Sequence, residues 1–172
     1  MPQPPEQRCA IQGRVKAMGM DTIGFRVVTF PQEYDSAIEL CINGQDFIEM
    51  VRRAELRFAE AEGHARIAGA YAGLPARVCA PPSRHFWGEA ESGRRDGKVA
   101  LLTCRGCGEI GCWPLLVRIV VGPWQVVWSE FEQPHRSGRG RVRAWDYDGF
   151  GPFVFDRDQY QEALQALGRG GG

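Results

Sequence analysis

Short apolar runs, each bounded by turn-forming residues, set the pattern of this chain. They are rich in β-branched and aromatic side chains, which favour extended strands. The Asn43-Gly44 pair after the second run is typical of a tight turn. We expect Trp113, Trp124 and Trp128 to pack in the core or on a sheet face. The predicted strands cover residues 24–30, 37–42, 99–103, 114–121, 124–131 and 153–155.

Two stretches instead repeat their apolar residues at helical spacing. The first begins at Asp46, because Glu49 three residues later matches the spacing of a capping box, and Gly63 is its expected end. The second begins at Asp156, followed by Gln159. The first helix is expected to bury Phe47, Ile48, Val51, Ala54, Leu56 and Phe58 and to expose Glu49, Arg52, Arg53, Glu55, Arg57 and Glu60. The second is expected to bury Tyr160, Ala163, Leu164 and Leu167 and to end at Gly168.

The order of these elements predicts one α+β domain with an antiparallel sheet, one helix after the second strand and another at the C-terminus. The domain is expected to span residues 11–167, between a loose N-terminal segment (1–10) and a flexible tail (168–172). Residues 63–98 show little periodicity and predict a long irregular segment with one short strand near 76–80.

Composition narrows the class of protein. The 172 residues are 44% hydrophobic, enough for an ordinary core. Lysine plus arginine equals aspartate plus glutamate at 21 each, so the formal net charge is zero. This argues against binding of nucleic acid or an anionic membrane through the charge of the whole domain. No apolar run reaches the roughly 20 residues of a membrane helix, and no secretory signal pattern is present. We therefore expect a cytoplasmic protein, in a compartment where clustered cysteines more often bind metal than form disulfides.

Three of the six cysteines fall within nine residues, "CRGCGEIGC" at 104–112. The pair Cys104 and Cys107 has the form of a zinc knuckle, in which a tight turn brings two sulfurs onto one metal. Gly108 accepts the positive φ that such a turn needs and leaves backbone N–H groups near the thiolates. Cys112 adds a third sulfur. The cluster predicts a zinc-knuckle-like loop between two strands.

Zinc prefers four ligands, so a structural site needs one more donor. If Gly122-Pro123 is the tip of a hairpin, Cys112 lies opposite position 133, and His135 comes two residues later at the same end. His135 is therefore the predicted fourth ligand. Cys79 is its rival and His85 a weaker candidate, both from the irregular segment.

Other interpretations of the cluster stay open. Redox thiols would be expected at the start of a helix, which lowers the thiolate pKa, whereas strands flank this cluster. An iron–sulfur cluster usually needs four thiolates. The three cysteines could also be incidental or simply packed, without binding a common metal ion.

Three further segments carry a resemblance. The stretches "CGEIGCWPL" (107–115), "EQPHR" (132–136) and "WDYDGFGPFVFDRDQYQEAL" (145–164) together resemble an uncharacterised bacterial protein family. That family has a cysteine cluster ending C-G-x-x-G-C-W-P-L, a Q-P-H-R segment and a G-P-F-x-F-D-R-x-Q-Y C-terminus. The resemblance implies a real module but no reaction. Cys104 departs from it, because the family pattern has C-x-C where this chain has C-x-x-C. The matching positions are Cys107, Cys112, Trp113, Pro114, His135, Arg136, Phe155, Asp156, Arg157 and Tyr160.

The leading functional hypothesis is a zinc-stabilised, protein-binding or regulatory accessory module, immunity-like in type, whose partner is another protein. One alternative is a metal-dependent hydrolase with an open zinc position, although no familiar catalytic motif is present. Another is RNA or DNA binding by the loop 136–143, with Trp145 and Tyr147 stacking on bases. The arginines of that loop are Arg136, Arg139, Arg141 and Arg143.

Overall fold

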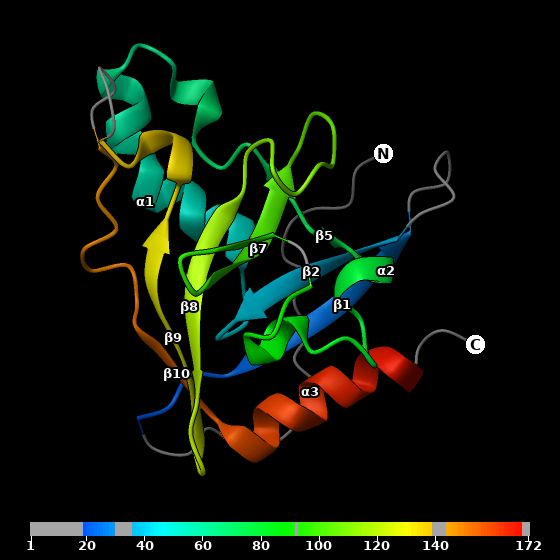
Figure 1. The fold of residues 1–172 in the computed structure, drawn as a ribbon. Helices are drawn as coiled ribbons and strands as arrows, with labels where there is room; N and C mark the ends of the chain where they lie inside the picture. The colour runs from blue at the N-terminus through cyan, green and yellow to red at the C-terminus, as the bar shows by residue number, and fades with distance from the viewer. Residues whose placement is uncertain (1–18, 30–35, 92, 139–143, 170–172) are drawn as a thin grey trace.

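The computed structural model describes residues 19–29, 36–91, 93–138 and 144–169. They form two antiparallel sheets and three α-helices, which confirms the predicted α+β class. In the view of Figure 1, strands β1 (Ile23–Thr29) and β2 (Ser36–Ile42) cross the long strands of the other sheet at a steep angle, and α3 (Arg157–Arg169) runs below β1. None of the helices in these ranges has the length and hydropathy needed to cross a membrane.

The smaller sheet is built around the antiparallel pair β1 and β2. Its order is β1-β2-β3, and β5 pairs with the first half of β2. Asn43 and Gly44 both have positive φ, 52° and 76°, as a tight two-residue hairpin turn requires. The turn predicted from these two residues is confirmed. The strands are β1 (Ile23–Thr29), β2 (Ser36–Ile42), β3 (Gln45–Asp46) and β5 (Leu74–Pro75).

The larger sheet has the order β10-β9-β8-β7-β4, with the short β6 also paired to β7. The long predicted strands are all present, and the β7–β8 connection is the cysteine-bearing loop. The strands are β4 (Tyr71–Ala72), β6 (Arg94–Arg95), β7 (Lys98–Cys104), β8 (Leu115–Val121), β9 (Gln125–Glu132) and β10 (Phe153–Asp156).

The β8–β9 hairpin differs in register from the prediction. A symmetric tip at Gly122-Pro123 would put Ser129 opposite Leu116, but Glu132 lies there. Two features cause the offset: the turn is wider, with the Gly122 amide bonded to the Gln125 carbonyl at 2.8 Å, and the ladder shifts near Glu130, whose φ is 54°. The wider turn also moves Trp124 out of the strand. It is 81% exposed, so its predicted packing was wrong.

Helix α1 (Phe47–Ala61) begins as predicted, because the Asp46 side chain accepts a hydrogen bond from the Glu49 amide at 2.9 Å. Its buried face was predicted less well. The fully buried row repeats every four residues and includes a glutamate that the sequence pattern assigned to the charged face. The row consists of Phe47, Val51, Glu55 and Ala59.

Helix α3 (Arg157–Arg169) starts where the Asp156 carboxylate accepts from the Gln159 amide at 2.9 Å, which confirms the predicted cap. Tyr160, Leu164 and Leu167 are buried, and the helix packs against β1. It continues one residue past Gly168, the expected end.

The segment 63–98 contains short elements that periodicity did not reveal. Residues near 76–80 form a helix rather than the predicted strand, since the Ala80 amide reaches back to the Ala76 carbonyl at 2.9 Å. These elements are η2 (Ala65–Ile67), α2 (Ala76–Cys79) and η3 (His85–Trp87). Helices α2 and η3 pack into the main core, whereas Ile67 of η2 packs against a smaller cluster formed by Ala59, Ala68 and Trp145.

Candidate metal centre

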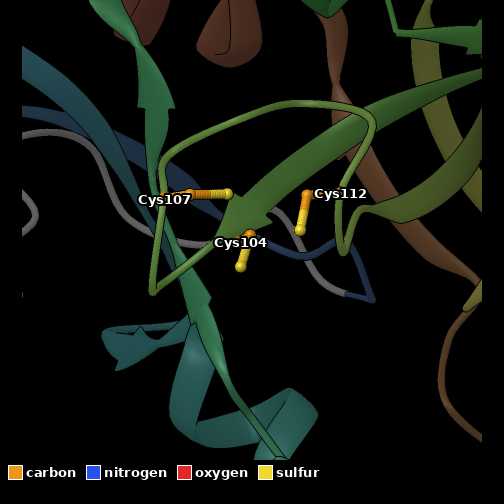
Figure 2. Close-up of side chains that lie close together, drawn as sticks. All are labelled: Cys104, Cys107 and Cys112. Atoms are coloured by element: carbon orange, nitrogen blue, oxygen red, sulfur yellow. The ribbon is translucent and has the colours of Figure 1, made fainter.

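Three cysteines meet at the end of β7. Cys104 is the last residue of the strand, and Cys107 and Cys112 lie in the loop that leads to β8. Their sulfur atoms all lie within 4.8 Å of one another, an arrangement that could hold a metal ion. Figure 2 shows the three side chains converging on the space inside the loop. The sequence therefore identified the members of this group correctly.

The first half of the loop forms the tight turn that the sequence predicts. The Gly108 amide bonds to the Cys104 carbonyl at 2.8 Å, and Gly108 has a φ of 70°, as predicted. The backbone N–H groups of Cys107 and Gly106 point at the Cys104 sulfur and lower its pKa, because these donors stabilise the thiolate. This geometry prepares one sulfur to act as a ligand before any metal binds.

The second half of the loop brings Cys112 back to the other two. A turn closes it, with the Cys112 amide 3.3 Å from the Glu109 carbonyl. The neighbouring thiols of Cys107 and Cys104 raise the pKa of Cys112 to about 11. Cys107 and Cys112 are exposed and Cys104 is half-buried, so a metal ion can reach all three from solvent.

The spacing of the sulfurs is close to what zinc requires. With Zn–S bonds of about 2.3 Å, a tetrahedral site places its sulfurs about 3.8 Å apart. Sulfurs that lie within 4.8 Å of one another need to close by roughly 1 Å or less. The loop has room for that movement, since Gly108 and Gly111 have no atom within 4 Å of the position a side chain would take.

His135, the predicted fourth ligand, lies outside this group. It belongs to η4 (Pro134–Arg136), where the chain turns after β9. Its amide bonds to the Gln133 side-chain oxygen at 3.0 Å, and its ring stacks flat on Trp113, with centroids 5.7 Å apart and an interplanar angle of 5°. The imidazole is therefore held against the indole and is not part of the group of three sulfurs.

The other candidate ligands are held elsewhere. Cys79 is completely buried in α2, and its thiol donates to the Pro75 carbonyl at 3.3 Å; burial raises its pKa to about 12. The buried His85 ring places Nε2 2.6 Å from the Ala100 carbonyl. Cys41 is disulfide-bonded. Among the described residues, no fourth histidine, cysteine, aspartate or glutamate joins the three sulfurs.

Two hollows adjoin the cysteines. One has a volume of about 380 Å³ and is almost entirely apolar. It is lined by Cys104 and Cys112 together with Ile67, Ala70, Arg105, Gly106, Trp113 and Arg136. The other is a polar cleft of about 310 Å³ on the Cys107 side, which also contains Arg105 and Glu109. The loop 104–114 therefore lies between an apolar hollow and a polar cleft.

The predicted nucleic-acid loop is described only at its edges. Arg139, Arg141 and Arg143 lie outside the described residues. Arg136 forms an ion pair with Glu62 at 3.1 Å and lies over the ring of Trp113. Its side chain is thus engaged within the protein.

The two aromatic residues predicted to stack on bases also face inward. Trp145 is 6% exposed and donates to the Glu62 carboxylate at 2.7 Å. Tyr147 is half-buried and donates to the Glu55 carboxylate at 2.6 Å. Neither ring is placed as a stacking platform.

Glu55 is the residue beside the site that sequence reasoning missed. It is 1% exposed and accepts hydrogen bonds from Tyr71, Tyr147 and the Gly69 amide. A signal existed in the chain: Phe47, Val51 and Ala59 mark a row with a four-residue repeat, and Glu55 occupies the remaining position of that row. A carboxylate inside an apolar row predicts a buried polar cluster.

No family model, curated protein or solved structure matches this chain. The chemistry of the cysteine group therefore carries the functional argument.

Proposed function

We propose that the chain binds one zinc ion through Cys104, Cys107 and Cys112. The single observation behind this proposal is the convergence of three sulfurs within 4.8 Å in a loop. Thiolate ligands favour zinc and other soft ions over magnesium or calcium. The backbone N–H groups directed at the Cys104 sulfur add the stabilisation of ligand thiolates that metal knuckles use.

We further propose that the zinc-bound loop serves as a docking surface for another protein. The zinc would fix a loop that has little packing of its own, and the apolar hollow beside Cys104 and Cys112 would supply contact area. Arg105, which is exposed, flanks that hollow and favours a partner segment that combines apolar and acidic side chains.

Metal analysis of the purified protein tests the proposal. Without chelators, inductively coupled plasma mass spectrometry should find about one zinc per chain, and each of Cys104→Ser, Cys107→Ser and Cys112→Ser should reduce it strongly. Cys79→Ala is the matched control and should keep its zinc, because Cys79 is buried in α2. Less than about a tenth of an equivalent in the wild-type protein would overturn the proposal.

The fourth position needs its own variant. We expect His135→Ala to retain zinc, because the imidazole is stacked on Trp113. A loss of zinc comparable to that of the cysteine variants would instead show that the ring leaves the stack and binds the metal, as the sequence predicts.

A metal-dependent hydrolase is the second candidate, and one observation favours it. Three ligands leave a tetrahedral zinc with one position for water, and zinc lowers the pKa of bound water toward 7. Glu109 in the neighbouring polar cleft is the carboxylate available for proton transfer. Ester hydrolysis that needs zinc and falls at least ten-fold in Glu109→Gln would support this candidate; activity unaffected by chelator would exclude it.

A further inference from the structure

A buried carboxylate that hydrogen bonds connect to the loop 104–114 has no cationic partner among the described residues. Glu55 is 1% exposed on α1, and no lysine, arginine or histidine pairs with it in the part of the chain that the structure describes. Three donors surround it: the Gly69 amide at 2.8 Å, the Tyr71 hydroxyl at 2.5 Å and the Tyr147 hydroxyl at 2.6 Å. A buried carboxylate is costly unless such donors satisfy it, and an apolar residue would fill the same space at lower cost. Its presence needs a reason beyond packing.

One line of contacts leads from Glu55 to the start of the loop 104–114. Gly69 and Tyr71, both bound to the carboxylate, flank Ala70. The Ala70 carbonyl accepts the Arg105 amide at 3.1 Å, and Tyr71 is the β-ladder partner of Cys104. The carboxylate thus fixes residues 69–71, the short segment against which Cys104 and Arg105 are held.

A second line leads to the end of the same loop. The Gln133 side-chain amide donates to the Tyr71 hydroxyl at 3.2 Å and to the Pro114 carbonyl at 3.1 Å. Pro114 comes two residues after Cys112. Gln133 is itself 1% exposed, so this link is shielded from water.

We infer that Glu55 is the positioning residue of the metal centre: through Tyr71, Gly69 and Gln133 it holds both ends of the loop 104–114 so that the three sulfurs converge. The inference rests on the proposed metal binding. A carboxylate suits this role because all three neighbouring groups donate to it, and its two oxygens accept from all of them at once. Glutamine in its place would turn an N–H₂ group toward at least one donor.

The test compares two buried tyrosines. Tyr71→Phe removes the hydroxyl that joins Glu55 to Gln133. Tyr160→Phe is the matched control, because the Tyr160 hydroxyl is also buried and doubly bonded, to the Phe86 carbonyl at 2.5 Å and to the Trp128 indole at 3.2 Å, but it makes no contact with the loop. Glu55→Gln is the third variant and changes the carboxylate itself.

Zinc affinity is measured by competition with a chromophoric chelator. Tyr71→Phe and Glu55→Gln should each weaken binding by about 10- to 100-fold, the range typical of residues that orient metal ligands, and Tyr160→Phe should stay within about three-fold of wild type. Equal affinities for Tyr71→Phe and Tyr160→Phe, or an unchanged affinity for Glu55→Gln with the fold retained, would overturn the inference.

Hydrogen exchange in the metal-free protein separates this inference from the proposed function. The Arg105 and Gly108 amides should exchange at least ten-fold faster in Tyr71→Phe than in Tyr160→Phe. If the two variants differ in this way but the wild-type protein binds no zinc, the metal site is overturned and Glu55 remains the anchor of the loop. No difference in exchange would overturn the anchoring itself.

Discussion

Two buried polar clusters in this protein differ in their charge and in the elements that they join. The cluster around Glu55 contains a carboxylate and joins α1, β4 and two loops. The cluster around Tyr160 contains no charged group and joins α3 to Trp128 on β9 and to the Phe86 carbonyl in η3. Both are shielded from water, and their hydrogen bonds have similar lengths.

The difference lies in what surrounds them. The Tyr160 ring lies 5.3 to 6.0 Å from the rings of Trp87, Phe155, Phe25 and Trp128, so packing already fixes its position. The loop 104–114 is glycine-rich and largely exposed, and it packs less tightly, with Ile110 and Trp113 lying against the core. A charged acceptor that gathers three donors supplies the missing constraint, because hydrogen bonds to charged groups are stronger than neutral ones.

The largest expected effect comes from the glycine that donates to Glu55. Gly69 has a φ of 64°, and an added Cβ would lie 2.5 Å from the Arg52 Cβ. Gly69→Ala should therefore lower the free energy of unfolding by about 3 kcal/mol, from overpacking and backbone strain together. Gly63→Ala is the control: its φ is 74° with no atom within 4 Å, and backbone strain alone should cost about 1 kcal/mol. Equal losses in urea denaturation would contradict the close packing at Gly69.

Removing one hydroxyl from each cluster compares charged and neutral hydrogen bonds directly. Tyr147→Phe removes a donor from the Glu55 carboxylate and should cost about 1.5–3 kcal/mol of unfolding free energy. Tyr160→Phe should cost about 0.5–1.5 kcal/mol, because its partners are neutral. Chemical denaturation of both variants checks the order. A larger cost at Tyr160 would remove the distinction drawn between the two clusters.

The two regions should also respond to pH with opposite signs. Burial raises the pKa of Glu55 above 4.5, so the folded state holds this proton more tightly, and stability is lost as the pH rises above 4.5. Burial lowers the pKa of His85, near the Tyr160 cluster, below 6.5, so stability is lost as the pH falls below 6.5. Unfolding free energies from pH 4 to 8 should show the first slope reduced in Glu55→Gln and the second reduced in His85→Gln. An unchanged slope in either variant would contradict the assignment for that residue.

The smallest effect is expected outside both clusters. Trp124 is 81% exposed at the tip of the β8–β9 hairpin, and its described interaction with Arg157 uses its backbone carbonyl. Trp124→Ser should change the unfolding free energy by less than about 0.5 kcal/mol. A loss above about 1 kcal/mol would show that the indole is packed in solution.

The contrast between local and long-range structure explains which features the sequence could predict. The caps at Asp46 and Asp156, the Asn43-Gly44 turn and the cysteine knuckle depend on residues a few positions apart, and all are present in the structure. Their hydrogen bonds are specified by the side chains and backbone angles of the segment itself.

The errors arose where distant contacts decide. Glu55 looked like part of a charged helix face, but Tyr71, Tyr147 and Gly69, which satisfy it, come from segments 14 to 92 residues away. The hairpin register depended on a wide turn and a ladder shift that a symmetric tip does not anticipate. The placement of His135 relied on that register, and its stacking on Trp113 could not be read from the chain alone.

X-ray absorption at the zinc edge of the purified protein tests the proposed zinc site. We expect a first shell of three sulfur atoms at about 2.3 Å and one lighter ligand at about 2.0–2.1 Å, with the sulfur count falling when Cys104, Cys107 or Cys112 is replaced by serine. A shell made only of nitrogen and oxygen, or a sulfur count unchanged in those three variants, would contradict it.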